Sequence, residues 1–146
     1  MPKKDWKKNN IEKLFKEKGL YPKTKINSIL DLACGLSLKS QYMNCDYIVG
    51  VDIFDKYLEK ITYNKNTILI KYDIRKILNL FLPKSFDIVL ILDVLEHLKR
   101  KESLKLLRDA EKIAKKAVII ETPLGFIPQN IDIWKMGGDK YQTHRS

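Results

Sequence analysis

Four apolar runs in this sequence each end in an aspartate, and the aspartates follow one another at nearly equal intervals. The runs end at Asp31, Asp52, Asp73 and Asp93, which are separated by 21, 21 and 20 residues. A strand, a turn and a helix take about that much chain in an open α/β sheet, where ligands bind at the carboxyl ends of the strands. The spacing therefore predicts that these carboxylates meet at one edge of a parallel sheet and share one pocket.

The first run continues into a loop of mostly small residues, ACGLS at positions 33–37. A strand, a small-residue turn and then an acid about 20 residues further on is a common way to hold a nucleoside-bearing cofactor. The three glycine positions of the dinucleotide fingerprint are here Ala33, Gly35 and Leu38, so only one is glycine. A carboxylate at Asp31 would repel a pyrophosphate and attract an ammonium or sulfonium group. The loop is therefore a poor match for NAD.

The next two aspartates suit other parts of such a cofactor. Asp52 can accept hydrogen bonds from both hydroxyls of a ribose. Asp73 can accept a hydrogen bond from an exocyclic amine, such as that of adenine. Each aspartate alone could instead cap a following helix. The register of all four with the glycine turn is what favours a joint binding site.

The hydropathy pattern supplies the sheet that would position these residues. Strands are expected at 26–32, 46–52, 67–72, 86–92 and 117–121, with 86–92 central because it is the most apolar. Helices are expected at 5–18, 37–43, 54–62, 74–81 and 94–116, the last with a break near Arg100. The pattern predicts a three-layer α/β domain with a mainly parallel sheet.

The chain is expected to form a single domain, 1–146, in three parts. Residues 1–25 form a basic N-terminal helix and linker, 26–122 the cofactor-binding core, and 123–146 a long loop or truncated end. The last part has no strand or helix period, and Gly137-Gly138 is a candidate hinge. We expect a mobile flap over the pocket that is not packed into the core. A loop that has lost the strands it once connected is the alternative.

The net charge of +10 lies mostly outside the expected sheet. Residues 1–25 carry a net charge of +6 and residues 99–116 of +5, whereas residues 26–98 carry −1. Such segments can attract RNA or another polyanion. Solvated lysine-rich faces are the more common reason for such an excess, so RNA binding through the basic helices stays an alternative.

Composition also sets expectations about location. No apolar run reaches the length of about 18 residues that a membrane-spanning helix needs, and the opening MPKKDWKKNN lacks the apolar stretch of a signal peptide. Two cysteines, Cys34 and Cys45, make neither a disulfide framework nor a metal quartet. We expect a cytoplasmic protein without a membrane partner, and the oligomeric state stays open.

In order along the chain, ILDLACGLS, IVGVDI, KYDI, FDIVLILDVLEHL and VIIETP resemble the successive motifs of class I S-adenosylmethionine-dependent methyltransferases. The resemblance covers roughly residues 26–124 and implies a Rossmann-like methyltransferase fold with S-adenosylmethionine as cofactor. It implies that Asp31, Ala33 and Gly35 hold the methionine end of the cofactor. The family's last two strands have no counterpart here, so the chain is either shortened or a natural minimal variant.

The same resemblance assigns the rest of the cofactor site. It implies that Asp52 holds the ribose, with Ile53 beside the adenine. It also implies that Asp73 and Ile74 contact the adenine. The end of the fourth strand, Leu92 and Asp93, then lies by the methyl donor.

We expect an enzyme that transfers a methyl group to an oxygen or nitrogen of a small-molecule acceptor. The alternatives are an RNA methyltransferase and an inactive, cofactor-binding interaction module. An in-line displacement on a sulfonium needs mainly alignment, and a general base only for a poorly acidic hydroxyl or a protonated amine. No catalytic residue is therefore assigned, although His97 and His144 are the only histidines.

Residues after the fourth strand also have the spacing of a metal site. Asp93, Glu96 and His97 stand at i, i+3 and i+4, so they would share one face of a helix. Some quinone-biosynthesis methyltransferases look similar here and use such residues for a divalent metal. The spacing alone is weak, and we expect no metal.

Overall fold

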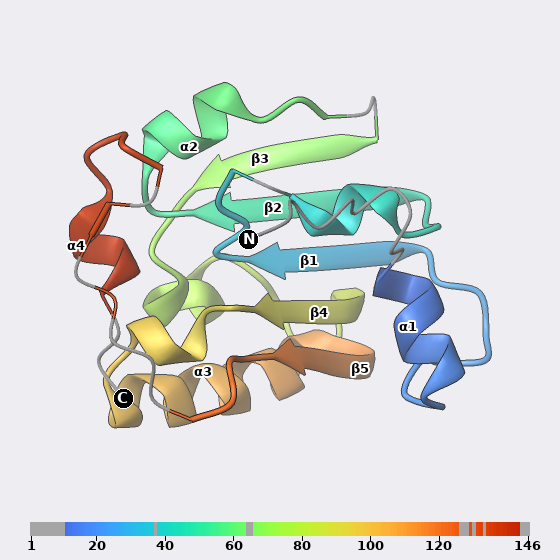
Figure 1. Cartoon of the computed structure of the whole chain (residues 1–146). Helices are drawn as coiled ribbons and strands as arrows, with labels where there is room; N and C mark the ends of the chain where they lie inside the picture. The colour runs from blue at the N-terminus through green and yellow to red at the C-terminus, as the bar shows by residue number, and fades with distance from the viewer. Residues whose placement is uncertain are drawn as a thin grey trace.

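The computed structural model of the chain describes residues 11–36, 38–63, 66–125, 129, 131–132 and 134–143. Within these residues five strands form one sheet in the order β3-β2-β1-β4-β5, and every neighbouring pair is parallel (Figure 1). The strands are β1 (Ser28–Leu32), β2 (Tyr47–Asp52), β3 (Thr67–Lys71), β4 (Phe86–Leu92) and β5 (Ala114–Glu121). The predicted Rossmann-like parallel sheet is confirmed, and no strand follows β5 in the described part of the chain.

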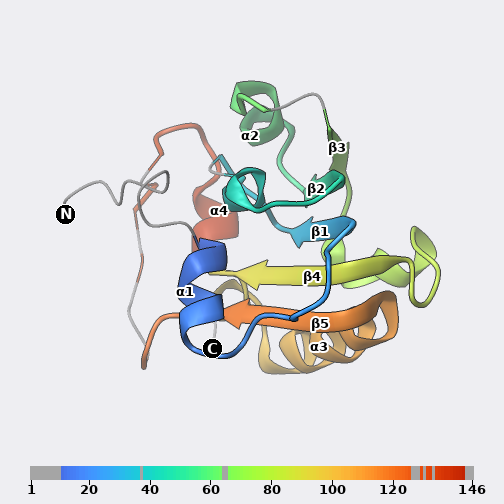
Figure 2. The ribbon, with the colours of Figure 1, turned by 90° about the vertical axis from the view of Figure 1, so that its right-hand side faces the viewer.

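Helices connect the strands and cover both faces of the sheet (Figure 2). One face packs against α1 (Ile11–Glu17), the 3-10 helix η1 (Lys39–Tyr42) and the region of α2 (Asp55–Lys60). The other face packs against the 3-10 helix η2 (Ile74–Asn79) and α3 (Arg100–Ile113). Two short elements lie outside these layers, namely η3 (Leu95–His97) and α4 (Asp139–Gln142). Among the helices in the described ranges, none is long and apolar enough to cross a membrane.

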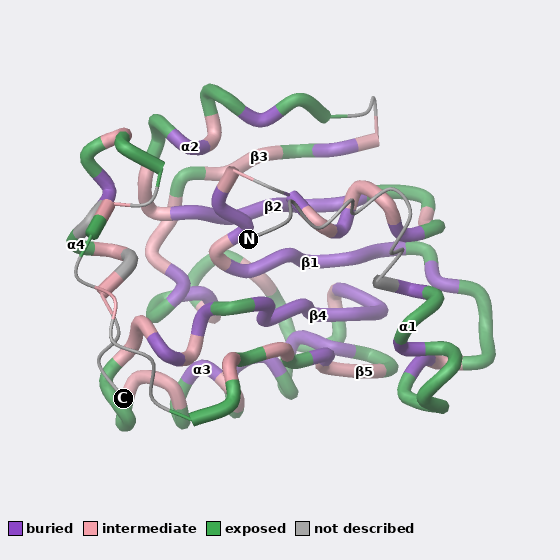
Figure 3. The backbone as a smooth tube through the Cα atoms, in the orientation of Figure 1, coloured by how far each residue is buried: buried purple, intermediate pink, exposed green. Residues whose placement is uncertain are grey.

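Strand β4 is buried along its whole length (Figure 3). Its alternate residues contribute to different cores, because successive side chains of a strand point to opposite faces. Leu90 belongs to the core under α1 and η1, whereas Ile91 belongs to the core under α3. Burial on both faces explains why this strand is the most apolar run of the sequence. The middle strand of the five is β1, however, and β4 lies next to it.

The expected helix at 94–116 differs most from the structure. It is broken before Arg100, as predicted, and the part before the break is only the short η3. Helix α3 ends at Ile113, and β5 begins at once with Ala114, three residues earlier than expected. The lysines that follow continue the helical period, but Ala114 pairs with Phe86 of β4. Strand pairing here overrides the local helix propensity.

Other helices are shorter than expected. Of the helix predicted at 5–18, the structure describes α1 over Ile11–Glu17, and residues 1–10 lie outside the described residues. The helices expected at 37–43 and 74–81 are the 3-10 helices η1 and η2. Side chains of η2 enter the core at Ile74 and Ile77, so tertiary packing stabilises these short turns.

Gly50 of β2 allows the loop after β1 to pack closely on the sheet. A Cβ atom at this position would lie 2.9 Å from Cδ1 of Leu38, 3.0 Å from Cδ2 of Leu69 and 3.1 Å from Sγ of Cys34. Leu38 is fully buried and Cys34 nearly so. The missing side chain therefore sets how deep the small-residue loop descends onto β2.

Candidate functional site

A cavity of about 480 Å³ opens at the carboxyl edge of the sheet. The chain segments that follow the first four strands contribute to its walls, together with two aromatic residues of the C-terminal segment. These contributions are Ala33 and Gly35 after β1, Asp52 and Ile53 after β2, Asp73, Ile74 and Arg75 after β3, Asp93, Val94 and His97 after β4, and Trp134 and Tyr141. A cavity at this edge is where a parallel α/β sheet binds its ligand.

The structure brings together most of the residues that the sequence indicated. Those that line the cavity are Ala33, Gly35, Asp52, Ile53, Asp73, Ile74 and Asp93. The other two, Asp31 and Leu92, do not line it. Leu92 is buried in the core under α1 and η1. The binding roles of all nine stay predictions.

Asp31 lies beneath the small-residue loop and does not face the cavity. The residue is 2% exposed, and Oδ2 accepts a hydrogen bond of 2.7 Å from Oγ of Ser40. Burial raises the pKa of this carboxyl to about 6, while the bond from Ser40 and the charge of Lys39 oppose the rise. In this structure Asp31 holds η1 against β1.

Asp52 joins the loops that follow β1 and β2. Its Oδ2 accepts the backbone N–H of Gly35, and its Oδ1 accepts the backbone N–H of Phe54, both at 2.9 Å. The residue is 6% exposed, so burial raises its pKa, and the backbone hydrogen bonds oppose the rise. Each carboxylate oxygen has two acceptor positions, so Asp52 keeps acceptor capacity for a further donor in the cavity.

The loop after β1 has an unusual backbone conformation. Ala33, Gly35 and Leu38 all have positive φ angles, of 53°, 58° and 36°. Glycine adopts this region without cost, whereas Ala33 and Leu38 are strained there. At Gly35 the indole ring of Trp134 also excludes a side chain, because a Cβ would lie 2.9 Å from its Cη2 atom. Gly35 is thus required both for the turn and for the close approach of this ring.

Asp93 directly follows β4 and forms an ion pair with Lys39. It has a positive φ of 54°, and its Oδ2 lies 2.9 Å from Nζ of Lys39. The same ammonium lies 3.5 Å from Oε1 of Glu121 at the end of β5. Lys39 therefore connects η1 to the carboxyl ends of two neighbouring strands.

The expected shared helix face of Asp93, Glu96 and His97 is wrong. Asp93 has a left-handed backbone and η3 begins only at Leu95, so these residues do not follow one helix. Glu96 is buried and accepts a hydrogen bond of 3.3 Å from Oγ1 of Thr122. Within the described residues, no group of three histidine, cysteine or acidic side chains is arranged to hold a metal ion.

The C-terminal segment packs over α2. Tyr57 meets Trp134 edge to face with ring centroids 4.8 Å apart, and Phe54 contacts Tyr141 at 5.5 Å. The backbone of Gly138 touches Tyr57, since a Cβ there would lie 2.0 Å from the phenol oxygen. The predicted position over the pocket agrees with this arrangement (Figure 1). The expectation of a segment without a helix is wrong, since α4 forms here. Among the described residues of the segment, none belongs to either core cluster of the sheet.

Of the residues that the sequence analysis names in this segment, His144 lies outside the described residues. Gly137 has a positive φ of 83°, and its backbone N–H donates to Oδ2 of Asp132 at 2.8 Å. The mobility of the segment stays a prediction.

Several residues that line the cavity were not assigned from the sequence. They are Tyr57, Arg75, Val94, Leu98, Lys99, Glu102 and Lys140. For Arg75 the sequence did contain a signal, because it stands only two residues after Asp73, which the sequence assigned to the site. For Glu102 of α3 and the residues just before this helix, no sequence spacing indicates that the fold returns them to the cavity.

The sheet order and the cavity define a Rossmann-like α/β domain with its ligand site at the carboxyl edge of the strands. A family described as a methyltransferase domain matches residues 30–120. The chain belongs to this family. No significant match is found among curated protein sequences.

Solved structures share the fold. A protein from Pyrococcus horikoshii is 27% identical with a TM-score of 0.58, over 77% of this chain and 56% of its own. A SAM-dependent methyltransferase from Archaeoglobus fulgidus is 24% identical with a TM-score of 0.59, over 79% of this chain and 52% of its own. Magnesium protoporphyrin IX methyltransferase from Synechocystis, with bound SAM, is 19% identical with a TM-score of 0.58, over 77% and 55%. This chain spans about half the length of these structures.

Asp31 makes the stability of the fold depend on pH. Its pKa in the folded protein, about 6, lies above the ordinary aspartate value, so folding favours the protonated form. The stability that this group contributes is complete only below the ordinary pKa of 3.8, and it is lost as the pH rises through the folded value of about 6. Between pH 4 and 7 the parent should lose roughly 2 kcal/mol that Asp31→Asn does not lose. Urea unfolding of both proteins at the two pH values measures this difference.

The matched control is Asp46→Asn, which removes an aspartate that is 56% exposed. Its stability difference from the parent should be nearly the same at both pH values. If the difference between the parent and Asp31→Asn does not change with pH, the carboxyl of Asp31 does not titrate as its burial requires.

Proposed function

We propose that this domain transfers a methyl group from S-adenosylmethionine to an oxygen or nitrogen of a small-molecule acceptor. One observation carries the proposal. The small-residue loop after β1, Asp52 and Asp73 line one cavity of about 480 Å³, which is the size of a small-molecule site. Family membership supports the reaction, and the SAM-bound structure of the Synechocystis enzyme, which has the same fold, supports the cofactor.

The residues present fit this cofactor. Asp52 has acceptor positions left for ribose hydroxyls after it binds the N–H groups of Gly35 and Phe54. Ile53 and Ile74 supply apolar surface on the wall of the cavity that Asp73 also lines, as an adenine ring requires. When bound, the cofactor supplies a sulfonium-activated methyl group. The protein then has mainly to hold the acceptor in line with that group, and positioning is worth roughly 7–11 kcal/mol of the barrier.

The acceptor would lie near the end of β4. Asp93, Val94 and His97 line the cavity there. Lys140 and Tyr141 of the C-terminal segment line the same cavity. The cavity opens to solvent at this edge, and its volume of about 480 Å³, shared with the cofactor, suits a small acceptor better than a polymer. A cytoplasmic setting is part of the proposal, and the free thiols of Cys34 and Cys45 agree with it.

The cofactor should be S-adenosylmethionine and not NAD. In calorimetry we expect S-adenosylmethionine and S-adenosylhomocysteine to bind and NAD to give no signal, because carboxylates repel a pyrophosphate. Asp52→Ala should weaken binding at least about tenfold, the effect of losing a charge-assisted hydrogen bond. Asp55→Ala is the control, since this exposed carboxylate pairs with Lys71 and does not line the cavity.

Circular dichroism would establish that Asp52→Ala is folded, because Asp52 also binds two backbone N–H groups. An unchanged dissociation constant in a folded variant would remove Asp52 from the site. Tight NAD binding without a response to S-adenosylmethionine would contradict the proposed cofactor.

Methyl transfer separates the proposal from its alternatives. With radiolabelled S-adenosylmethionine, we expect label to move to small hydroxyl or amine acceptors in a broad panel. Transfer to RNA, with binding that weakens steeply with salt, would instead favour the RNA methyltransferase. Cofactor binding without transfer to any acceptor would favour the inactive interaction module.

The C-terminal segment should act as a lid. Trp134 lies against Gly35, so a ligand bound at this loop must change its surroundings. Because Trp6 and Trp134 are the only tryptophans, Trp6→Phe makes the emission specific for Trp134. We expect this emission to change with the affinity measured by calorimetry, and proteolysis near Gly137 to slow when cofactor and acceptor are bound. If saturating ligands change neither signal, the segment is not a lid, and the alternative of a loop without its strands stands.

A further inference from the structure

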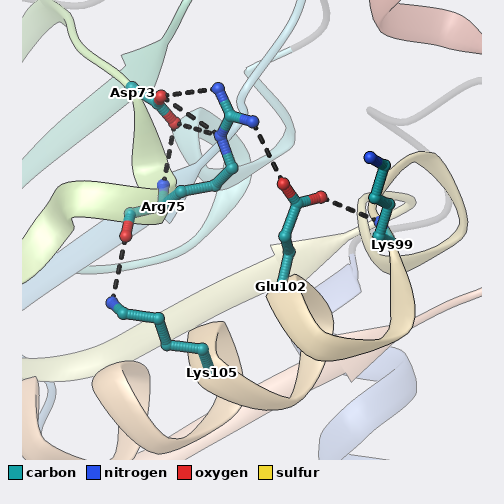
Figure 4. Close-up of polar contacts among 5 residues, drawn as sticks. All are labelled: Asp73, Arg75, Lys99, Glu102 and Lys105. Atoms are coloured by element: carbon teal, nitrogen blue, oxygen red, sulfur yellow. Dashed lines mark hydrogen bonds and ion pairs between the residues drawn. The ribbon is translucent and has the colours of Figure 1, made fainter.

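The carboxylate of Asp73 is bound by the side chain of Arg75. Nε of Arg75 lies 2.9 Å from Oδ1 and 3.1 Å from Oδ2, and Nη2 lies 2.8 Å from Oδ2 (Figure 4). The backbone N–H of Arg75 also donates to Oδ1 at 3.0 Å. The guanidinium therefore binds the carboxylate through two of its nitrogens. This bidentate geometry fixes the orientation of the carboxylate in addition to pairing its charge.

The other end of this guanidinium is held by α3. Nη1 of Arg75 lies 3.1 Å from Oε1 of Glu102, and Oε2 of Glu102 accepts the backbone N–H of Lys99 at 2.9 Å (Figure 4). Nζ of Lys105 donates to the carbonyl oxygen of Arg75 at 3.0 Å. Arg75 is thus fixed between the end of β3 and the first turns of α3, so it cannot rotate away without breaking contacts on both sides.

The contacts with Arg75 occupy most of the hydrogen-bond acceptor positions of the Asp73 carboxylate. An ionised carboxylate offers about four positions, two on each oxygen. Oδ1 of Asp73 accepts two donors from Arg75, and Oδ2 accepts Nη2 and shares Nε at a longer distance. The second position on Oδ2 is occupied only by the longer, 3.1 Å half of the Nε hydrogen bond, so it is the position that a ligand donor can take. Asp73 and Arg75 both line the cavity, so a bound ligand can reach this region.

We propose that Arg75 is a positioning and specificity-determining residue for the cofactor's base. By holding Asp73 in one orientation, it leaves a single acceptor position for the exocyclic amine of adenine. This inference rests on the proposed function. It predicts that the protein distinguishes adenine from a purine without the amine, and that the distinction depends on Arg75.

If Arg75 had only a structural role, a different experimental result would be expected. Arg75 also connects η2 to α3, and its side chain is 46% exposed. If it served only as this tether, its removal would change stability and leave the choice of base unaltered. If instead Arg75 competed with the cofactor for Asp73, its removal would tighten binding. The ratio of two cofactor affinities therefore identifies the role.

The test measures calorimetric affinities for S-adenosylhomocysteine and for its analogue with an unsubstituted purine base. The parent should prefer the adenine ligand by at least about tenfold, as expected for a charge-assisted hydrogen bond. Arg75→Ala should reduce this preference at least threefold, and Arg75→Lys should not restore it, because an ammonium cannot form the planar fork. Lys76→Ala, which removes the same charge from an exposed position of η2, should keep the preference.

Each outcome has one meaning once thermal unfolding shows that the variants are folded. If the parent binds neither ligand, the proposed function fails. If the parent binds both ligands equally, or if Arg75→Ala keeps the parent's preference, the inference is overturned while the cofactor stands. Tighter binding of S-adenosylhomocysteine by Arg75→Ala would show competition and would also overturn it.

Discussion

The site depends on one buried carboxylate. Asp52 accepts the N–H of Gly35 from the loop after β1 and the N–H of Phe54 from the turn after β2. Breaking either hydrogen bond would destabilise the fold, because a buried charge without donors is strongly unfavourable. The two segments are therefore held together at the edge of the sheet. The contact of Trp134 with Gly35 and that of Tyr141 with Phe54 both rest on these segments.

A second constraint is that four acids share one edge of a sheet. Like charges at short range disfavour one another, and the structure gives each carboxylate a different partner. The partners are Ser40 for Asp31, two backbone N–H groups for Asp52, Arg75 for Asp73 and Lys39 for Asp93. The pKa values move accordingly: burial raises those of Asp31 and Asp52, whereas Arg75 lowers that of Asp73. The acids at one edge thus have distinct electrostatic surroundings and need not share one role.

The sequence predicted the strands and their terminal acids well, because buried parallel strands are continuous apolar runs. It failed where distant parts of the chain decide. Ala114 enters β5 because Phe86 pairs with it, although the lysines after it continue a helical period. The bond between Arg75 and Glu102 spans 27 residues, and no local pattern encodes it. The burial of Asp31 and its hydrogen bond from Ser40 were likewise not indicated by the sequence, and its role in binding stays a prediction.

A crystal structure of this chain with S-adenosylhomocysteine tests the central claim most directly, namely that the loop held by Asp52 builds the cofactor site. We expect ribose hydroxyls within hydrogen-bonding distance of Asp52, the adenine amine on Oδ2 of Asp73 with Arg75 still in place, and Trp134 displaced from Gly35. A ligand bound away from this edge of the sheet, or one whose ribose does not contact Asp52, would contradict it.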